Sequence, residues 1–221
     1  MVAGTIPLLI RVLRHFDIGQ EIRAEGPQGH HVKQGTPTMG GMSILVIASL
    51  VFGVMTALAF PAVDSSAAKL DNYRGAVDAA VLVALTMVAC GVLGFIDDYS
   101  KVANKRSLGL TPSAKLIGQV TIGVVFSIAA INWVGITPDL QIPATGVILD
   151  LGVWTSSVAL GSITIYLPWL YLAFCTTMIV GMSNAVNLTD GLDGLAAGTV
   201  TIVVLVFGAI AYAQNALPVA L

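Results

Sequence analysis

The sequence has little charge. Lys, Arg, Asp and Glu make up 10% of its 221 residues, whereas a soluble domain carries about a quarter. The formal net charge is -2 and the isoelectric point is near 5.8, so there is no basic field for nucleic acid, and any recognition of phosphate must come from local lysines. Hydrophobic residues make up 56% and the mean hydropathy is +0.89. This composition excludes a nucleic-acid-binding protein and indicates a chain built for a lipid bilayer.

Cysteine is also scarce. Cys90 and Cys175 lie inside apolar runs, without a Cys-x-x-Cys pair or a Cys and His spacing that would suit zinc. We therefore expect two buried thiols, with neither a disulfide nor a zinc site. The alternating polar pattern of a membrane β-barrel is absent. No positively charged segment precedes the first apolar run, which argues against a cleaved secretory signal.

The apolar residues fall in runs of about 20, the length that an α-helix needs to cross roughly 30 Å of hydrocarbon. The sequence therefore predicts an all-α polytopic membrane protein, with a bundle of about five complete transmembrane helices plus a partial first one. The complete spans are expected at residues 39–61, 76–96, 116–134, 163–182 and 195–213. Residues 135–161, between two of them, are expected to form irregular surface structure with a short hairpin.

The two ends of the chain point to a single membrane domain over residues 1–221 that is incomplete at both ends. Val2–Ile10 is apolar but reaches Arg11 at once, and about ten helical residues cover only about 15 Å. Leu221 follows the last span with no polar tail. We expect further membrane segments before and after the given sequence.

The lysines and arginines predict the orientation of the spans, because short loops that carry them stay in the cytoplasm. Eight of them lie in or border the loops before the first complete span and after the second. The other two, Lys69 and Arg74, lie in the opposite loop. The loops before the first complete span, after the second, and at Ser183–Gly194 are therefore expected to face the cytoplasm. Three polar clusters lie at these boundaries.

The first cluster runs from Gly29 to Gly41 and contains Lys33 and Thr38. Its glycines would let backbone N–H groups approach an anion, and Lys33 adds a positive charge. It lacks the Gly-Lys-Ser/Thr ending of a nucleotide P-loop. The structural alternative is a helix start capped by Thr38, with Lys33 in solvent.

The second cluster is Asp97-Asp98 at the end of a predicted span. Two adjacent carboxylates beside apolar residues suit proton abstraction or Mg²⁺ binding, and they would titrate as a coupled pair. The lysines that follow could hold phosphate oxygens: Lys101, Lys105 and Lys115. The alternatives are a solvated helix end and the ordinary positive bias of cytoplasmic loops.

The third cluster contains Asn184, Asn187, Asp190 and Asp193. On one continuous helix these side chains cannot share a face, and the glycines at 191 and 194 predict a turn. A bend there would bring Asn187, Asp190 and Asp193 together, with oxygen and amide groups for a metal, a ribose or a base. The structural alternative is a capped loop between two spans.

In this order and between these spans, the clusters resemble the phospho-N-acetylmuramoyl-pentapeptide transferases of the polyprenyl-phosphate sugar-1-phosphate transferase superfamily. The similarity is strongest at Lys33–Gly41, Gly94–Tyr99 and Asn184–Gly194. It implies a Mg²⁺-dependent enzyme of the bacterial inner membrane, with its site facing the cytoplasm. The enzyme would transfer phospho-N-acetylmuramoyl-pentapeptide from its UDP-linked donor to undecaprenyl phosphate, giving lipid I and UMP for peptidoglycan synthesis. A homodimer is a further expectation.

The resemblance also implies roles for individual residues. Asp98 matches an aspartate proposed as a base acting on the lipid phosphate, and Asp97 matches its essential neighbour. Residues that match the uridine and ribose pocket are Lys33, Thr38, Asn187, Asp190 and Asp193, and the loop lysines Lys101, Lys105 and Lys115 match residues thought to hold phosphate. The family's Mg²⁺-binding aspartate and a three-histidine motif would lie beyond Leu221, so a chain ending there is expected to insert into membranes without transferring phospho-sugar. Asp97 and Asp98 are possible metal ligands as well.

Two rival functions stay open on the sequence. A sister transferase would move GlcNAc-1-phosphate to a polyprenyl phosphate. An ion-coupled transporter would need polar residues near the middle of broken spans, whereas here the carboxylates gather at the span ends.

Overall fold

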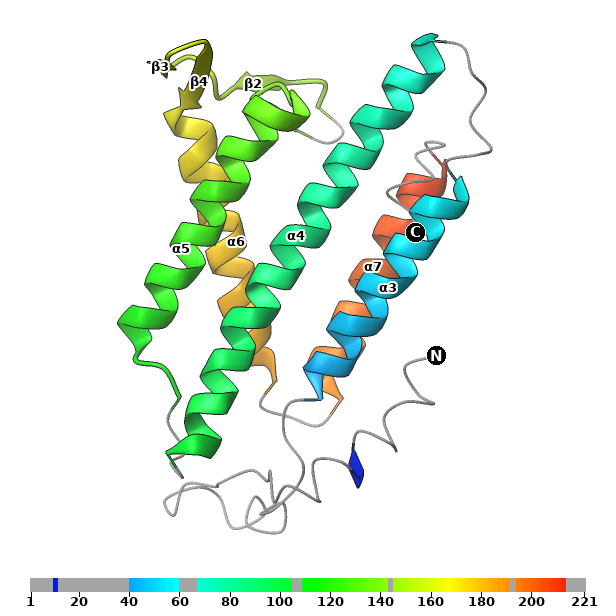
Figure 1. Cartoon of the computed structure of the whole chain (residues 1–221), viewed down its shortest axis with the longest axis vertical. Coiled ribbons are helices and arrows are strands. Elements are labelled where there is room, and N and C mark those ends of the chain that lie inside the picture. The colour runs from blue at the N-terminus through cyan, green and yellow to red at the C-terminus, as the bar shows by residue number, and fades with distance from the viewer. Residues whose placement is uncertain are drawn as a thin grey trace. The chain divides into compact units, whose positions relative to one another are not determined.

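The structure of the chain, a computed structural model, describes residues 10–11, 40–59, 67–104, 109–142, 145–190 and 194–213. Long helices dominate it, together with two short β-hairpins (Figure 1). The chain divides into two compact units. One comprises Met1–Val54 and Met87–Gly118, and the other comprises Met55–Thr86 and Gln119–Leu221. The expectation of one membrane domain over residues 1–221 stays a prediction.

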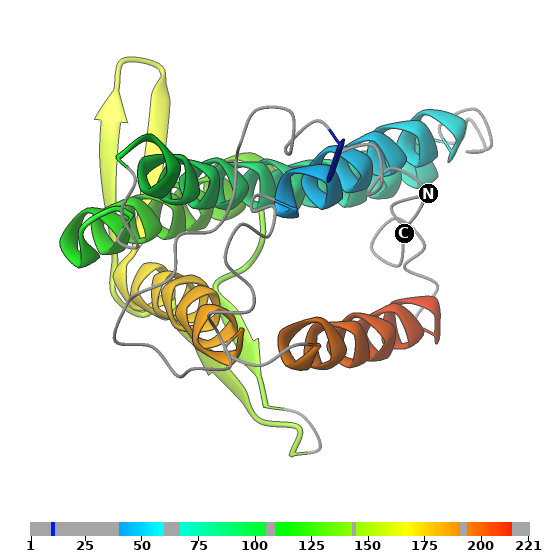
Figure 2. The ribbon, with the colours of Figure 1, turned by 90° about the horizontal axis from the view of Figure 1, so that it is seen from below.

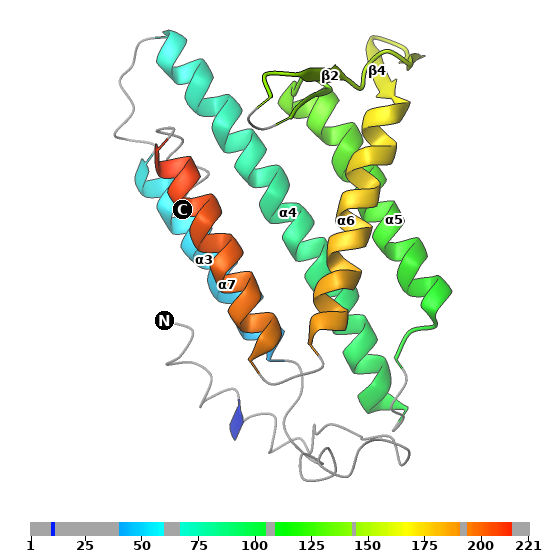
Figure 3. The same cartoon turned by 180° about the vertical axis from the view of Figure 1, so that it is seen from behind.

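The helices follow the predicted apolar runs (Figure 3). They are α3 (Gly41–Ala59), α4 (Ala67–Ala103), α5 (Pro112–Ala129), α6 (Trp169–Thr189) and α7 (Leu195–Ala213), and α5 continues as the π-helical segment η2 (Ala130–Val134). Within the described ranges, four segments are long and apolar enough to cross a membrane: Gly41–Leu58, Arg74–Ala103, Pro112–Val134 and Trp169–Thr189. The prediction of a polytopic helical membrane protein is confirmed. Helix α7 has the predicted bounds, but its apolar part, Leu195–Ile210, is shorter than those four segments.

Helix α4 is longer than the predicted span of residues 76–96. Its 37 residues correspond to about 55 Å of helix, well above the roughly 30 Å of a hydrocarbon core. Backbone hydrogen bonds do not require apolar side chains, so the helix continues through Asp97 and Asp98. Lys101 in the last turn complements the negative end of the helix dipole. The aspartate pair therefore stands on a rigid helix and not in the loop that follows.

The predicted start of a span at Ile163 is wrong. Ile163–Pro168 is strand β4, which pairs antiparallel with β3 (Thr155–Leu160), and helix α6 begins only at Trp169. An apolar run does not by itself separate a strand from a helix, and the β-branched residues of this one favour a strand. Gly161 has a φ of 65°, which the tight turn between the strands requires.

The short hairpin expected within residues 135–161 is confirmed. Strand β1 (Asp139–Gln141) pairs with β2 (Ile148–Asp150), with Asp139 opposite Asp150. Seen from below, the two hairpins extend in opposite directions from the ends of α5 and α6 (Figure 2).

The part of helix α5 from Gln119 onward lies beside α6 in the second unit (Figures 1 and 3). A Cβ atom at Gly123 of α5 would lie 2.9 Å from the Cα of Thr176 on α6, so a glycine is required for this close approach. Leu82, Tyr171 and Leu172 form the buried core nearby together with Ala130. Most other apolar side chains of the described helices are exposed, as expected where lipid is the solvent.

Candidate active site

The aspartate pair is joined by a lysine of the same helix. Lys101 Nζ lies 2.8 Å from Asp97 Oδ2 and 2.8 Å from Asp98 Oδ1. These residues are three and four positions apart on α4, the spacing at which helical side chains meet. The ammonium group therefore reduces the repulsion between the two neighbouring carboxylates. Lys101 was expected to hold phosphate oxygens, and here its charge is shared with both aspartates.

Asp97 also fixes the segment that follows the helix. The backbone N–H of Leu110 donates to Asp97 Oδ1 at 2.9 Å. A Cβ atom at Gly109 would lie 2.5 Å from both the carbonyl oxygen and Oδ1 of Asp97, closer than a real Cβ atom comes. Both carboxylate oxygens of Asp97 are thus occupied, one by Lys101 and one by the backbone. We infer that Asp97 has a structural part in holding this segment against α4.

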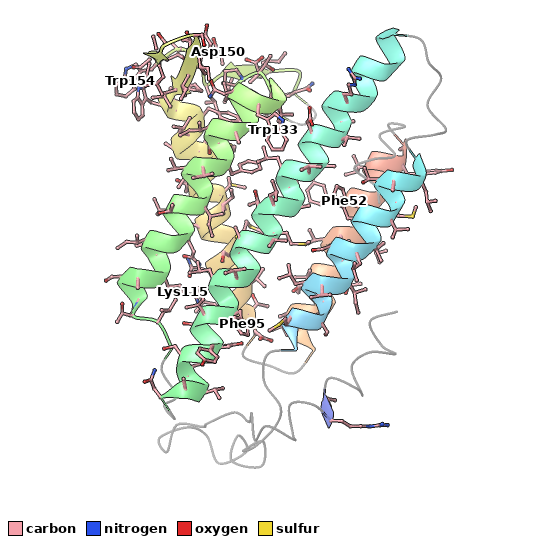
Figure 4. The ribbon with its side chains drawn as sticks, in the orientation of Figure 1. Phe52, Phe95, Lys115, Trp133, Asp150 and Trp154 are labelled. Carbon is pink, nitrogen blue, oxygen red and sulfur yellow. The ribbon has the colours of Figure 1, made fainter. Side chains whose placement is uncertain are left out.

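Helix α5 starts immediately beyond that segment. Thr111 Oγ1 accepts a hydrogen bond from the Ala114 N–H at 3.3 Å, and Pro112 occupies the first helical position, where its missing N–H costs nothing. The start places half-buried Lys115 close enough to Asp97 for an electrostatic interaction. Figure 4 shows Lys115 at the lower end of α5 and Phe95 at the lower end of α4.

Asp98 is the more accessible carboxylate. Its side chain is 35% exposed, against 14% for Asp97. Among the described residues its hydrogen bonding engages only Oδ1, so Oδ2 can accept a proton or bind a ligand. Phe95 and Tyr99 stack on the same helix with ring centroids 6.0 Å apart. The two aspartates therefore differ in what they can do, and Asp98 is the candidate for chemistry.

A second polar cluster lies between α5 and α6. The Gln119 side chain is 2% exposed and donates to Ser183 Oγ at 3.0 Å, while Asn184 Nδ2 donates to Gln119 Oε1 at 2.8 Å. Asn184 Nδ2 also donates to the Val180 carbonyl at 2.9 Å. Carboxamides that serve each other in this way satisfy groups that would be costly to bury alone. The cluster joins the two helices in the turns before α6 ends.

The polar residues at the end of α6 are exposed. Asn187 lies in the last turns of the helix, and Asp190 follows it at the C-cap with its backbone N–H bonded to the Val186 carbonyl. The predicted break in the helix is confirmed there. Gly194 has a φ of 79°, and α7 begins at the next residue. Asn187 and Asp190 are thus accessible to a ligand.

Four of the predicted site residues lie outside the described residues: Lys33, Thr38, Lys105 and Asp193. Asp97, Asp98, Lys101 and Lys115 belong to one compact unit, and Asn187 and Asp190 to the other. That all of these residues form one site stays a prediction.

Sequence reasoning overlooked three residues that the structure ties to these clusters. A glycine is required at position 109 because the backbone there lies so close to Asp97. No pattern in the sequence indicates this requirement. Gln119 is different, because an uncharged polar side chain within an apolar span is unusual enough to be noticed. Ser183 was assigned to a loop, whereas it lies within α6.

Among the described residues, no three His, Cys, Asp or Glu side chains are grouped as a complete metal site would require. A Mg²⁺ ion needs less from the protein, because it is commonly bound by one or two carboxylates, with phosphate oxygens and water as the other ligands. Oδ2 of Asp98 fits such a role, whereas both oxygens of Asp97 are engaged.

These features define a class. The chain is a multi-pass helical membrane protein with a lysine-bridged aspartate pair at the end of one span and exposed polar residues at the end of another.

Comparison with known proteins gives the family. Residues 80–221 match the model for glycosyl transferase family 4, and the chain belongs to that family. It is similar to proteins named phospho-N-acetylmuramoyl-pentapeptide-transferase, with 41% identity to the one from Halalkalibacterium halodurans and 40% to the one from Bacillus subtilis, each over 215 residues. These alignments cover 97% of the chain and 57% of each relative, so the chain spans little more than half their length.

Proposed function

We propose that the chain is part of an enzyme that transfers phospho-N-acetylmuramoyl-pentapeptide from its UDP-linked donor to undecaprenyl phosphate. The products would be lipid I and UMP. The observation that carries the proposal is the partly exposed carboxylate of Asp98 beside Lys101, at the end of a membrane-spanning helix. Such a position suits a reaction between a water-soluble nucleotide and a lipid phosphate. The names of the relatives support this donor over UDP-GlcNAc.

In the proposed reaction, an oxygen of the lipid phosphate attacks the phosphorus that carries the sugar. The bond from that phosphorus to the bridging oxygen of UMP breaks, and UMP leaves with this oxygen. Asp98 Oδ2 takes a proton from the lipid phosphate, which makes the attacking oxygen a better nucleophile. Phosphoryl transfer between two anions depends mainly on positioning and charge neutralisation.

Lysines supply part of that neutralisation. Lys101 uses two of its three N–H donors on the aspartates, which leaves one for a phosphate oxygen. Lys115 adds a second positive charge near Asp97, and Lys105 belongs to the same proposed group. A Mg²⁺ ion held by Asp98 and the donor phosphates would neutralise further charge on the diphosphate.

For the donor nucleotide we propose the residues that the resemblance implies. They are Asn187 and Asp190 at the exposed end of α6, together with Lys33, Thr38 and Asp193. A carboxamide donates and accepts hydrogen bonds, which suits the uracil edge, and a carboxylate accepts them, which suits the ribose hydroxyls. Lys33→Ala should weaken binding of the donor, measured by calorimetry. An unchanged affinity would mean that Lys33 is a solvated loop residue that does not bind the donor.

The proposed site faces the cytoplasm, where the nucleotide is made. Cysteines placed within residues 17–34 or 100–113 should then resist an impermeant thiol reagent in intact spheroplasts, and a cysteine at Thr145 should react. The opposite labelling pattern would show that the topology is inverted. The proposed site would then lie on the other side of the membrane from its nucleotide donor. A homodimer is part of the same proposal, and cross-linking in membranes tests it.

The donor is tested directly with radiolabelled substrates. Because the chain covers 57% of the Bacillus subtilis relative, the assay uses membranes in which it is extended with the part of that relative outside the alignment. The unextended chain runs in parallel. Label should pass to lipid from UDP-N-acetylmuramoyl-pentapeptide. Transfer from UDP-GlcNAc alone would assign the sister reaction instead.

A further inference from the structure

The β3–β4 hairpin has one apolar and one polar face. In the observed register, Leu160 pairs with Ile163 and Val158 with Ile165, so these four side chains share a face with Leu167 and with its partner Ser156 at the base. The opposite face carries Thr155, Ser157, Ala159, Thr164 and Tyr166, with the buried Pro168 at its base. A water-exposed loop would not need this alternation.

The apolar face is covered only at its base. Leu167 packs against the buried cluster of Tyr171 and Leu172. Toward the tip, Val158 is 45%, Leu160 61% and Ile163 64% exposed. No Lys, Arg, Asp or Glu occurs between residues 151 and 189. The tip therefore presents aliphatic side chains with no charge that could direct them toward a polar partner.

The hairpin runs across the ends of the helices and not along them. In Figure 1 it is foreshortened above α5 and α6, and in Figure 2, turned by 90°, its strands are seen at full length beside those helix ends. A hairpin in this position lies roughly parallel to the membrane surface, at the level where α5 ends and α6 begins.

Two contacts hold the base of the hairpin in that direction. Asn132 of η2 donates to the Tyr166 carbonyl at 2.9 Å and accepts from the Tyr166 N–H at 2.8 Å. Trp169, the first residue of α6, donates its indole N–H to Ser156 Oγ at 3.0 Å. The hairpin is thus fixed to the π-helical segment η2 and to the first turn of α6.

All three tryptophans of the chain lie at this boundary. Trp133 lies in η2, Trp154 precedes β3, and Trp169 begins α6. Figure 4 shows the first two at the same end of the helices. They are 47%, 64% and 42% exposed. Tryptophan collects where hydrocarbon meets lipid headgroups, because its ring is apolar and its N–H is polar.

We propose that the β3–β4 hairpin lies flat on the lipid bilayer, with Val158, Leu160 and Ile163 inserted at the boundary between headgroups and acyl chains. The occupant of the apolar face is lipid because the face is continuous with α6, which spans the membrane, and because it is bordered by interfacial tryptophans. The polar face with Ser157 and Thr164 is turned to water. The proposal does not depend on the transfer reaction.

The test compares adjacent positions that point to opposite faces. Single cysteines at Leu160 and Ile163 report on the apolar face, and Ala159→Cys and Thr164→Cys are the matched controls. Each variant, with both native cysteines replaced by alanine, is labelled with an environment-sensitive fluorophore. The protein is placed as a single copy in nanodiscs that contain lipids with a nitroxide near the top of the acyl chain.

Labels at positions 160 and 163 should emit at shorter wavelength and be quenched by the nitroxide lipids but not by aqueous iodide. Labels at 159 and 164 should emit at longer wavelength and be quenched by aqueous iodide but not by the nitroxide lipids. Iodide quenching at all four positions would overturn the proposal, as would protection at 160 and 163 without quenching by lipid, which would mean that protein covers the face. Protection that appears only with two copies per disc would instead assign the face to an interface between copies.

Discussion

The carboxylate–lysine cluster of Asp97, Asp98 and Lys101 and the amide cluster of Gln119, Ser183 and Asn184 are both polar groups on membrane-spanning helices. They differ in charge and in burial. Asp98 and Lys101 are 35% and 37% exposed, whereas Gln119 is 2% exposed. The charged cluster keeps contact with the surroundings. The amide cluster is neutral, with Gln119 buried and Ser183 and Asn184 half-buried, and its members pair with each other.

The difference follows from the cost of removing polar groups from water. An ion pair that is fully buried loses more solvation than its attraction returns unless its geometry is excellent, while a carboxamide pair can be buried when its hydrogen bonds are made. Exposure also keeps Asp98 available to a substrate. We therefore expect substitutions in the charged cluster to change mainly activity, and substitutions in the amide cluster to change mainly stability.

The largest effect is expected from Asp98→Asn in the extended protein. Asparagine keeps the shape of the side chain but cannot take the proton, and loss of a general base costs about 10²- to 10⁴-fold in rate. Lipid I formation should fall by this amount, while nucleotide binding measured by calorimetry stays nearly unchanged. Near-normal turnover would remove Asp98 from the chemistry.

Gly109→Ala tests the structural part of Asp97. The added methyl group would collide with Asp97, so the segment at Leu110 must move, at a cost of about 1–3 kcal/mol in unfolding free energy. Thermal unfolding in detergent measures the loss, and Gly94→Ala on α4, where a Cβ atom meets nothing within 4 Å, is the matched control. Equal stability of the two variants would show that the segment is not held against the aspartate.

Gln119→Leu should destabilise the protein by about 1–2 kcal/mol, because Asn184 loses its partner inside the bundle and hydrogen bonds between membrane helices contribute up to about this amount. The double variant Gln119→Leu, Asn184→Leu should recover part of the loss, since neither polar group is then left alone. Additive losses in the double variant would contradict reciprocal pairing.

Lys101→Met is expected to have the smallest effect on stability, about 1 kcal/mol or less, because its ion pairs are partly exposed. The loss should shrink further at high salt, which screens such charges. For Gln119→Leu the loss should be independent of salt. A salt-insensitive, larger loss for Lys101→Met would mean that the charged cluster is more deeply enclosed than the exposures indicate.

The sequence and the structure agree best where hydrophobicity alone decides. Helix α7 has the predicted bounds, and α3 and α5 lie close to theirs, because long apolar runs leave a helix as the only structure that satisfies its own backbone in lipid. The agreement fails at Ile163–Pro168, since a short apolar run that continues into a span does not reveal where strand ends and helix begins.

For the candidate site, the sequence by itself determined which residues carry charge and that Asp97, Asp98 and Lys101 are near one another, because they are close along the chain. Only the tertiary structure decided which carboxylate oxygens of the two aspartates already have a hydrogen-bond partner and which one is open to a ligand. The Leu110 N–H occupies Asp97 from 13 residues away, and Gln119 meets Asn184 across 65 residues. Such contacts depend on how closely helices and loops pack, and packing distance is set by side chains from distant parts of the sequence, which no local pattern encodes.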